Sequence, residues 1–135
     1  MPSIIYNNFR EDIGKGTIKL DSDTFKVMLL ANTYTPNAEH TTPSQVNTHE
    51  LANGNGYVTG GVTLQSVVWS RSGSTVKFDA NDAEWSEATF TARYGVIYSA
   101  TANRLVACID FGSDKSCSNQ SFFIRWHDDG IITLT

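Results

Sequence analysis

The sequence predicts an all-β fold, a β-sandwich or jelly-roll-like barrel, with one short N-terminal helix. Seven to eight short segments alternate apolar with polar residues and are separated by turn residues. Apolar residues recur at helical spacing only near the start of the chain, at about residues 3–14. The length of 135 residues suits one domain, which we take as residues 1–135.

The N-terminal helix is predicted from one apolar stripe. Ile5, Phe9 and Ile13 recur at intervals of four, Ser3 can cap the first turn, and Gly14 ends the pattern. A helix of about three turns is marginal alone in water. We therefore expect its stripe to dock on the sandwich or on a neighbouring subunit.

Residues 24–34 are expected to form the central strand. Phe25, Val27 and Leu29 fall on one face, while Met28 and Leu30 make the other face apolar as well. Apolar residues on both faces are typical of a strand inside a sandwich or barrel. We expect further strands at residues 62–69, 75–79, 84–86, 89–99, 105–111, 121–126 and 131–135, and a polar loop at 112–120.

Residues 35–61 form a long segment rich in Pro, Asn and Gly with almost no apolar periodicity. Such a segment is too long for a passive connection, so it is either functional or disordered. Because its apolar residues and those of the helix have the least reason to be buried within one subunit, we expect both segments to contact a partner. The expected contact residues are Ile5, Phe9, Tyr34, Val46, Leu51 and Tyr57.

Charge and composition limit the partners. The 14 acidic and 10 basic residues give a net charge of -4, and the basic residues are scattered, so we expect no nucleic-acid partner. No apolar run approaches the roughly 20 residues that span a bilayer, and the N-terminus lacks the regions of a secretory signal. We expect a soluble protein made in the cytoplasm, with no membrane partner. Cys108 and Cys117 are expected to be free thiols, with a disulfide across a hairpin as the alternative.

No catalytic, cofactor or metal site is predicted, and we expect the protein not to be an enzyme. His40, His49 and His127 lack the spacing of a metal-ligand pair. A Gly-x-Ser-x-Gly elbow and a glycine loop that leads into a helix are both missing from the sequence.

Two alternatives remain open. Paired carboxylates near an aromatic residue are used in glycoside hydrolysis, which predicts a cleft that holds at least two of Asp82, Glu84, Glu87 and His127. A carbohydrate-binding face predicts exposed, clustered aromatic residues from the set Trp69, Trp85, Trp126, Tyr94 and Tyr98. Tyr94 and Tyr98 fall on the same strand face as Phe90 and Val96, and Trp126 on the same face as Phe122 and Ile124. This pattern instead favours a core position for most of the set.

Several segments together resemble a known family. They are DTFKVMLL at 23–30, YTPN at 34–37 with His40, HEL at 49–51, GNGY at 54–57, FDANDAEW at 78–85, ARYGVIY at 92–98, DFG at 110–112, and FIRW at 123–126 ahead of Gly130 and Ile131. Over nearly the whole chain, the sequence resembles small virion structural proteins of tailed bacteriophages, of the head decoration or cement type.

This resemblance implies a role and a location. It implies a capsid decoration protein that binds between major capsid subunits, stabilises the head, and forms a homotrimer on the capsid surface of the virion after synthesis in the host bacterial cytoplasm. The alternative role is a tail or appendage component that binds a carbohydrate or another feature of the host surface. The resemblance implies no catalytic residue.

Overall fold

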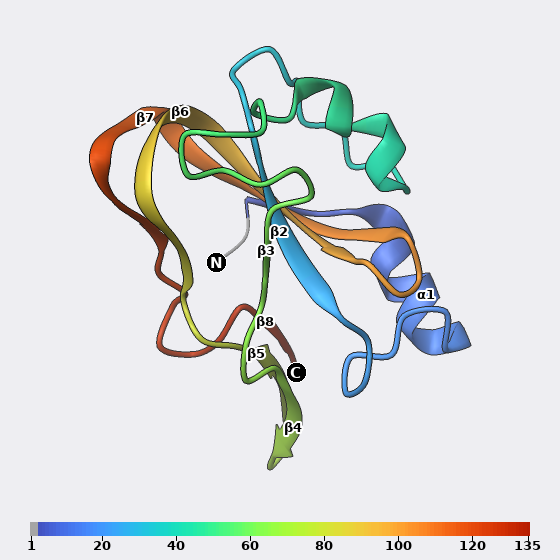
Figure 1. The fold of residues 1–135 in the computed structure, drawn as a ribbon. Helices are drawn as coiled ribbons and strands as arrows, with labels where there is room; N and C mark the ends of the chain where they lie inside the picture. Colours follow the sequence, from blue (N-terminus) through green and yellow to red (C-terminus); the bar gives the residue numbers. More distant parts are fainter. Residues whose placement is uncertain (1–2) are drawn as a thin grey trace.

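The computed structural model describes residues 3–135, which form two antiparallel sheets and one α-helix (Figure 1). The strands are β1 (Ile4–Ile5), β2 (Phe25–Leu30), β3 (Val62–Thr63), β4 (Val68–Ser72), β5 (Thr75–Asp79), β6 (Ala83–Ser99), β7 (Arg104–Ile124) and β8 (Ile132–Leu134). The helix is α1 (Asn7–Lys15), and two 3-10 helices, η1 (Pro43–Gln45) and η2 (Asn47–His49), lie between β2 and β3. The larger sheet has the order β1-β7-β6-β2-β3 and the smaller one β4-β5-β8. The predicted all-β, sandwich-like fold with one short helix is confirmed. Among the described residues, no helix is long and apolar enough to cross a membrane.

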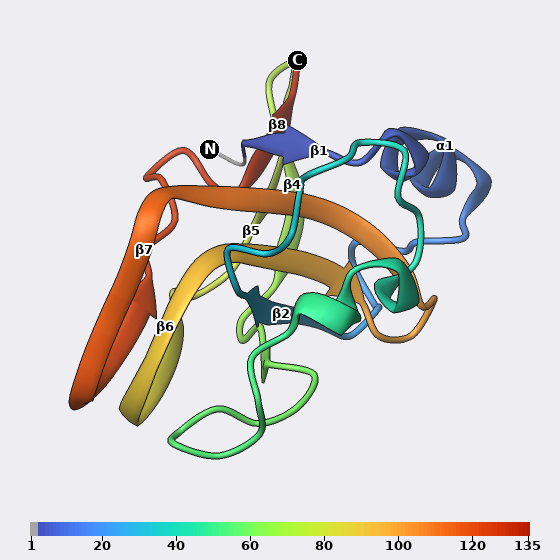
Figure 2. The same ribbon diagram turned by 90° about the horizontal axis from the view of Figure 1, so that it is seen from above.

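The strands β6 and β7 form a long, bent ribbon that dominates the larger sheet (Figure 2). Between the pairs Ala92↔Lys115 and Tyr94↔Asp110, one residue of β6 faces residues 111–114 of β7. Extra residues on one strand bend and twist a ribbon. The bulge therefore explains how both strands can turn without losing their partner.

The expected polar loop at residues 112–120 is wrong, because this segment belongs to β7. Only Cys117 in it is buried, and the other side chains are exposed, so the segment shows little apolar alternation. Its backbone nevertheless pairs with β6, and the hydroxyls of Thr91 and Ser116 lie 2.7 Å apart across the two strands. Likewise, the strands expected at 84–86 and 89–99 join into β6.

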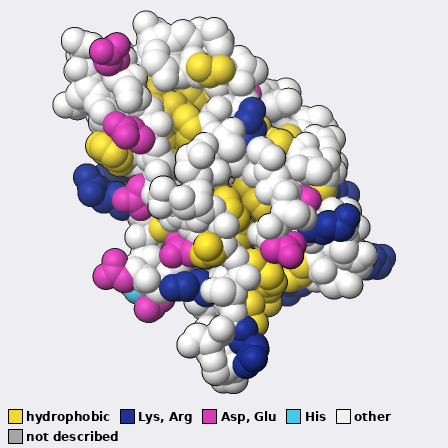
Figure 3. Space-filling model, turned by 60° about the horizontal axis from the view of Figure 1, so that its bottom comes forward, with side chains coloured by type: hydrophobic (Ala, Val, Ile, Leu, Met, Phe, Trp, Pro, Cys, Tyr) yellow, Lys and Arg dark blue, Asp and Glu magenta, His cyan; other side chains and the backbone are white. Residues whose placement is uncertain are grey.

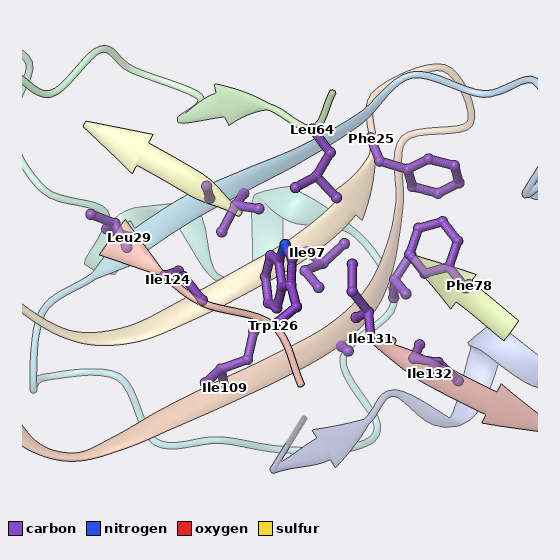
Figure 4. Packing of buried hydrophobic residues seen from close by; sticks show 14 of the residues in the cluster. Phe25, Leu29, Leu64, Phe78, Ile97, Ile109, Ile124, Trp126, Ile131 and Ile132 are labelled. Carbon is purple, nitrogen blue, oxygen red and sulfur yellow. The ribbon is translucent and has the colours of Figure 1, made fainter. Parts of the chain in front are cut away.

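The strand β2 is apolar on both faces, as predicted, and each face contributes to a different core. Phe25, Val27 and Leu29 join the core between the two sheets, where Phe25 meets Phe78 of β5 at a ring distance of 5.1 Å (Figure 4). Met28 and Leu30 lie in a second core on the opposite face of the larger sheet.

The central position in the larger sheet belongs to β6, which corrects the expectation for residues 24–34. β2 lies between β6 and the two-residue β3. Part of its outer edge is paired with the long segment instead, through the amide of Leu51 to the carbonyl of Leu29 at 3.1 Å and the amide of Ala31 to the carbonyl of His49 at 2.9 Å.

The helix begins later than predicted. Ile4 and Ile5 pair with Cys108 and Ala107 as β1, because the edge of β7 supplies backbone partners that a first helical turn would not have. Ser3 does not cap the helix, and its hydroxyl accepts a hydrogen bond from the amide of Asp110 at 2.7 Å.

An ion pair between the buried carboxylate of Asp12 and the partly exposed guanidinium of Arg104 holds the helix on β7. The guanidinium of Arg104 donates two hydrogen bonds to the carboxylate of Asp12, at 2.8 and 3.2 Å. Asn8, one turn earlier, donates to the same carboxylate at 2.7 Å and to the carbonyl of Leu105 at 3.1 Å. The helix therefore docks within its own subunit, by polar contacts as well as by its apolar stripe.

Candidate interaction surface

Residues 50–61, called the pinned loop below, are fixed to the larger sheet by one buried phenol. Tyr57 is 1% exposed, and its hydroxyl accepts a hydrogen bond from the amide of Leu29 at 3.1 Å and donates one to Oε2 of Glu50. The same carboxylate oxygen accepts the amide of Gly60 at 2.7 Å. Burial, and next the bond to Glu50, raise the pKa of Tyr57, so the phenol is neutral and donates at ordinary pH.

Two glycines let the backbone of the pinned loop lie directly on the sheet. Gly61 has a φ of +86°, and a Cβ there would lie 1.7 Å from the carbonyl oxygen of Val27. Gly56 has a φ of +89°, and a Cβ there would lie 2.7 Å from Cα of Ala88. Any larger residue would clash and would also be strained at these angles. The loop is therefore ordered by close backbone contact with β2 and β6.

The pinned loop presents an exposed apolar side chain. Val58 follows the buried Tyr57 in the sequence and is 65% exposed. Among residues 3–135, the other large apolar residues with high exposure are Val68 on β4 at 46% and Phe123 on β7 at 44%. Figure 3 shows one face of the molecule, on which hydrophobic side chains form separate patches among polar and charged ones. An exposed apolar residue on an ordered loop can be covered by a partner with little loss of conformational freedom.

Most of the predicted contact residues are buried within the subunit. Phe9, Tyr34, Val46 and Tyr57 are each at most 2% exposed, while Ile5 and Leu51 are half-buried. The premise that these apolar residues have least reason to be buried in the monomer is therefore wrong for four of the six. Two of the four, Tyr34 and Val46, cover the second core, which the smaller sheet does not reach.

The second core contains a chain of polar groups. The hydroxyls of Tyr6 and Tyr34 lie 2.9 Å apart, and Tyr34 meets Nδ1 of His40 at 3.0 Å. The Tyr34 ring also lies 5.6 Å from the ring of His49. Burial raises the pKa of the nearby Cys108 thiol to about 12. His40 and His49 therefore both pack against Tyr34 and help to order residues 34–49.

Both cysteines are free and buried, which confirms the expected thiols. Within residues 3–135, no group of three His, Cys, Asp or Glu side chains could hold a metal ion.

The four acid–base candidates do not meet in one cleft around His127. That histidine lines a cavity of about 350 Å³ together with Ile5 and residues 129–133. Asp82, Glu84 and Glu87 do not line this cavity. Asp82 instead accepts the amide of Trp126 at 3.0 Å, and Glu84 accepts the hydroxyl of Ser121 at 3.0 Å.

The aromatic residues lie mainly in the cores, as their alternation predicted. Trp85, Trp126, Tyr94 and Tyr98 are at most 8% exposed. Trp69 is half-buried and lines a cavity of about 370 Å³, whose other walls include Ile13, Ile18, Leu20, Lys19 and Asp21.

Sequence reasoning missed Val58. The available signal was its position between glycines, directly after a tyrosine that alternation would place inside. Comparison of the chain with protein-family models, with curated proteins and with solved structures finds no match.

Proposed function

We propose that this chain is a structural protein of a tailed-bacteriophage virion that decorates the capsid and binds between major capsid subunits. The resemblance described above, which extends over nearly the whole chain, supports this role. The structural observation that carries the proposal is the pinned loop, which holds the exposed Val58 on a backbone fixed by Tyr57, Glu50 and two glycines.

The physical argument concerns the cost of binding. An adhesive protein gains affinity from buried area and from a few apolar anchors near the centre of the interface. An anchor on a flexible loop loses conformational freedom on binding, and that loss weakens the complex. The bonds from Tyr57 to Leu29 and Glu50 fix the loop before binding, so Val58 loses little freedom when a partner covers it.

A tail or appendage module that binds a host-surface glycan is the second candidate. The observation that favours it is the cavity lined by the indole of Trp69, with Asp21 and Lys19 among the other lining residues. An indole face packs against the apolar face of a sugar ring, and charged groups nearby can bond its hydroxyls.

Binding to capsids assembled without this protein tests the proposal. The wild-type chain is expected to bind saturably, and Val58→Asp is expected to weaken binding by about 100-fold, because a charge is then buried without a partner. Val68→Asp is the matched control, since it changes another exposed valine that lies on β4 of the smaller sheet, and it is expected to bind normally. Failure of the wild-type chain to bind capsids, or equal loss in the two variants, would contradict the proposal.

A glycan screen with the wild-type chain and Trp69→Ala addresses the second candidate. Sugar binding that this substitution abolishes, together with association to tails, would favour the tail or appendage role. Absence of any sugar binding would remove it.

A further inference from the structure

The two sheets leave several strand edges unpaired, and these edges differ in how they are protected. Residues 111–124 of β7 lie beyond the short β1, but they contain a bulge and the charged residues Asp114 and Lys115. The outer strand β4 contains Arg71, whose guanidinium donates to the carbonyl of Gly73 at 2.9 Å. Bulges and charges on an edge discourage pairing with another chain.

The edge of β8 has none of these features. β8 pairs with β5 on one side and, within residues 3–135, has no strand on the other. Its sequence, Ile132, Thr133 and Leu134, has no charge, proline or glycine. An edge without charge, proline or a bulge is a template for an added strand, and the three residues of β8 limit such pairing to a short stretch.

A surface cavity adjoins β8. Its volume is about 350 Å³, and it is lined by Ile131, Ile132 and Thr133 and, from the other sheet, by Ile5 of β1. β1 is itself the last strand of the larger sheet, so residues from the outer strands of both sheets line the cavity. Ile5, Ile131 and Ile132 make one part of this cavity apolar, while His127, Asp129 and Thr133 make the rest polar.

The side chains of β8 are self-complementary. Ile132 is buried and Leu134 half-buried, while Thr133 between them is exposed. When two identical antiparallel strands are related by a two-fold axis, the residue numbers of any two residues that lie opposite each other add up to the same value. If the axis passes through Thr133, Ile132 lies opposite Leu134 of the second copy, and the two Thr133 side chains lie opposite each other. Apolar residues then meet on the inner face and hydroxyls on the outer face, both of which are favourable cross-strand pairs.

We propose that a second copy of this chain pairs with β8 edge to edge, antiparallel and about a two-fold axis at Thr133, so that the two smaller sheets become one continuous sheet of six strands. Leu134 of the second copy points towards the cavity between β8 and Ile5. This pairing does not depend on the proposed capsid role, because it requires only the chain itself.

Charge substitutions at the axis test this geometry. Thr133→Lys places two ammonium groups opposite each other in a homodimer, and Thr133→Glu places two carboxylates there. Like charges in direct contact oppose association, so each variant alone is expected to dimerise about 100-fold more weakly than the wild-type chain. An equal mixture of the two variants places opposite charges across the axis and is expected to regain dimers.

Sedimentation equilibrium over a wide concentration range measures the mass of each sample. Thr133 is exposed, so both variants are expected to fold, and circular dichroism with thermal unfolding checks this. Ser72→Lys, on the opposite edge strand of the same sheet, is the matched control and is expected to dimerise like the wild-type chain.

The proposal is overturned by three results. The first is a monomeric wild-type chain at high concentration, and the second is a dimer or trimer whose mass Thr133→Lys leaves unchanged. The third is a mixture of the Lys and Glu variants that stays monomeric although each variant is folded.

Discussion

Tyr57 and Glu50 form one hydrogen-bonded unit that closes the pinned loop onto β2. The carboxylate of Glu50, at the start of the loop, accepts both the Tyr57 hydroxyl and the amide of Gly60 near its end. The Tyr57 oxygen in turn accepts the amide of Leu29 from the sheet. The exposed position of Val58 is therefore set by its buried neighbour, and substitutions at the two residues should have separable effects.

Replacement of Tyr57 by phenylalanine is expected to destabilise the fold by about 1–3 kcal/mol, because the buried amide of Leu29 and the carboxylate of Glu50 both lose a partner. Urea unfolding measures the loss, and amide hydrogen exchange of residues 51–60 should accelerate. Val58→Ala, an exposed change beside it, is expected to stay within about 0.5 kcal/mol of the wild-type chain and to keep its slow exchange. Unchanged exchange in Tyr57→Phe would show that the loop is held by other contacts.

The ion pair between Asp12 and Arg104 is expected to be the main polar anchor of α1. Asp12→Ala leaves the guanidinium and the side chain of Asn8 without their shared acceptor, and we expect a loss of about 3 kcal/mol in the free energy of unfolding. The neighbouring Glu11→Ala removes only a surface pair with Lys15 and should cost about 0.5 kcal/mol or less. Equal effects of the two substitutions in chemical denaturation would contradict this assignment.

The fold class follows from alternation because residues 25–30 and 90–98 carry apolar side chains at regular intervals. The outer part of β7 escaped prediction, since a ribbon with one solvated face needs few apolar residues and its register depends on backbone pairing. β1 was missed for a related reason. Two isoleucines fit a helical stripe as well as a strand, and only the edge of β7 decides between them.

The candidate site was predicted at the level of the segment but not of the residue. Residues 35–61 were identified by their length and composition. Which of their apolar side chains are exposed depends on the second core, which needs Tyr34 and Val46 as a cover. The position of Val58 directly after Tyr57 was a local signal for its exposure, which is 65%, but nothing local in the sequence indicates that Val46 is fully buried.

The thiol of Cys108 is expected to be unreactive in the folded protein. It is fully buried, and burial raises its pKa to about 12, so almost no thiolate forms at neutral pH. In Cys117→Ser, a disulfide reagent such as Ellman's reagent should label no thiol in the native protein and one thiol in guanidinium chloride. Rapid labelling of the native variant would show that the second core opens readily.

The pair between Asp110 and Arg93 is expected to make stability fall in acid. The guanidinium of Arg93, and next the amide of Gly112, hold the pKa of Asp110 below its ordinary value of 3.8. The unfolded chain therefore takes up this proton at a higher pH than the folded chain. The stabilisation is complete above the ordinary pKa and is lost as the pH falls below 3.8 through the folded pKa.

Urea midpoints measured from neutral pH into this acid range test the expectation with Asp110→Asn. The variant should be less stable than the wild-type chain at neutral pH, and the gap should close as the pH falls below 3.8. Because both side chains are partly exposed, the gap should be small and should shrink when salt is added. In an Arg93→Gln background, the same substitution should have a weaker pH dependence, since the main cause of the shift is gone. A gap that stays constant with pH would show that Asp110 stabilises the ribbon by hydrogen bonds that do not depend on its charge.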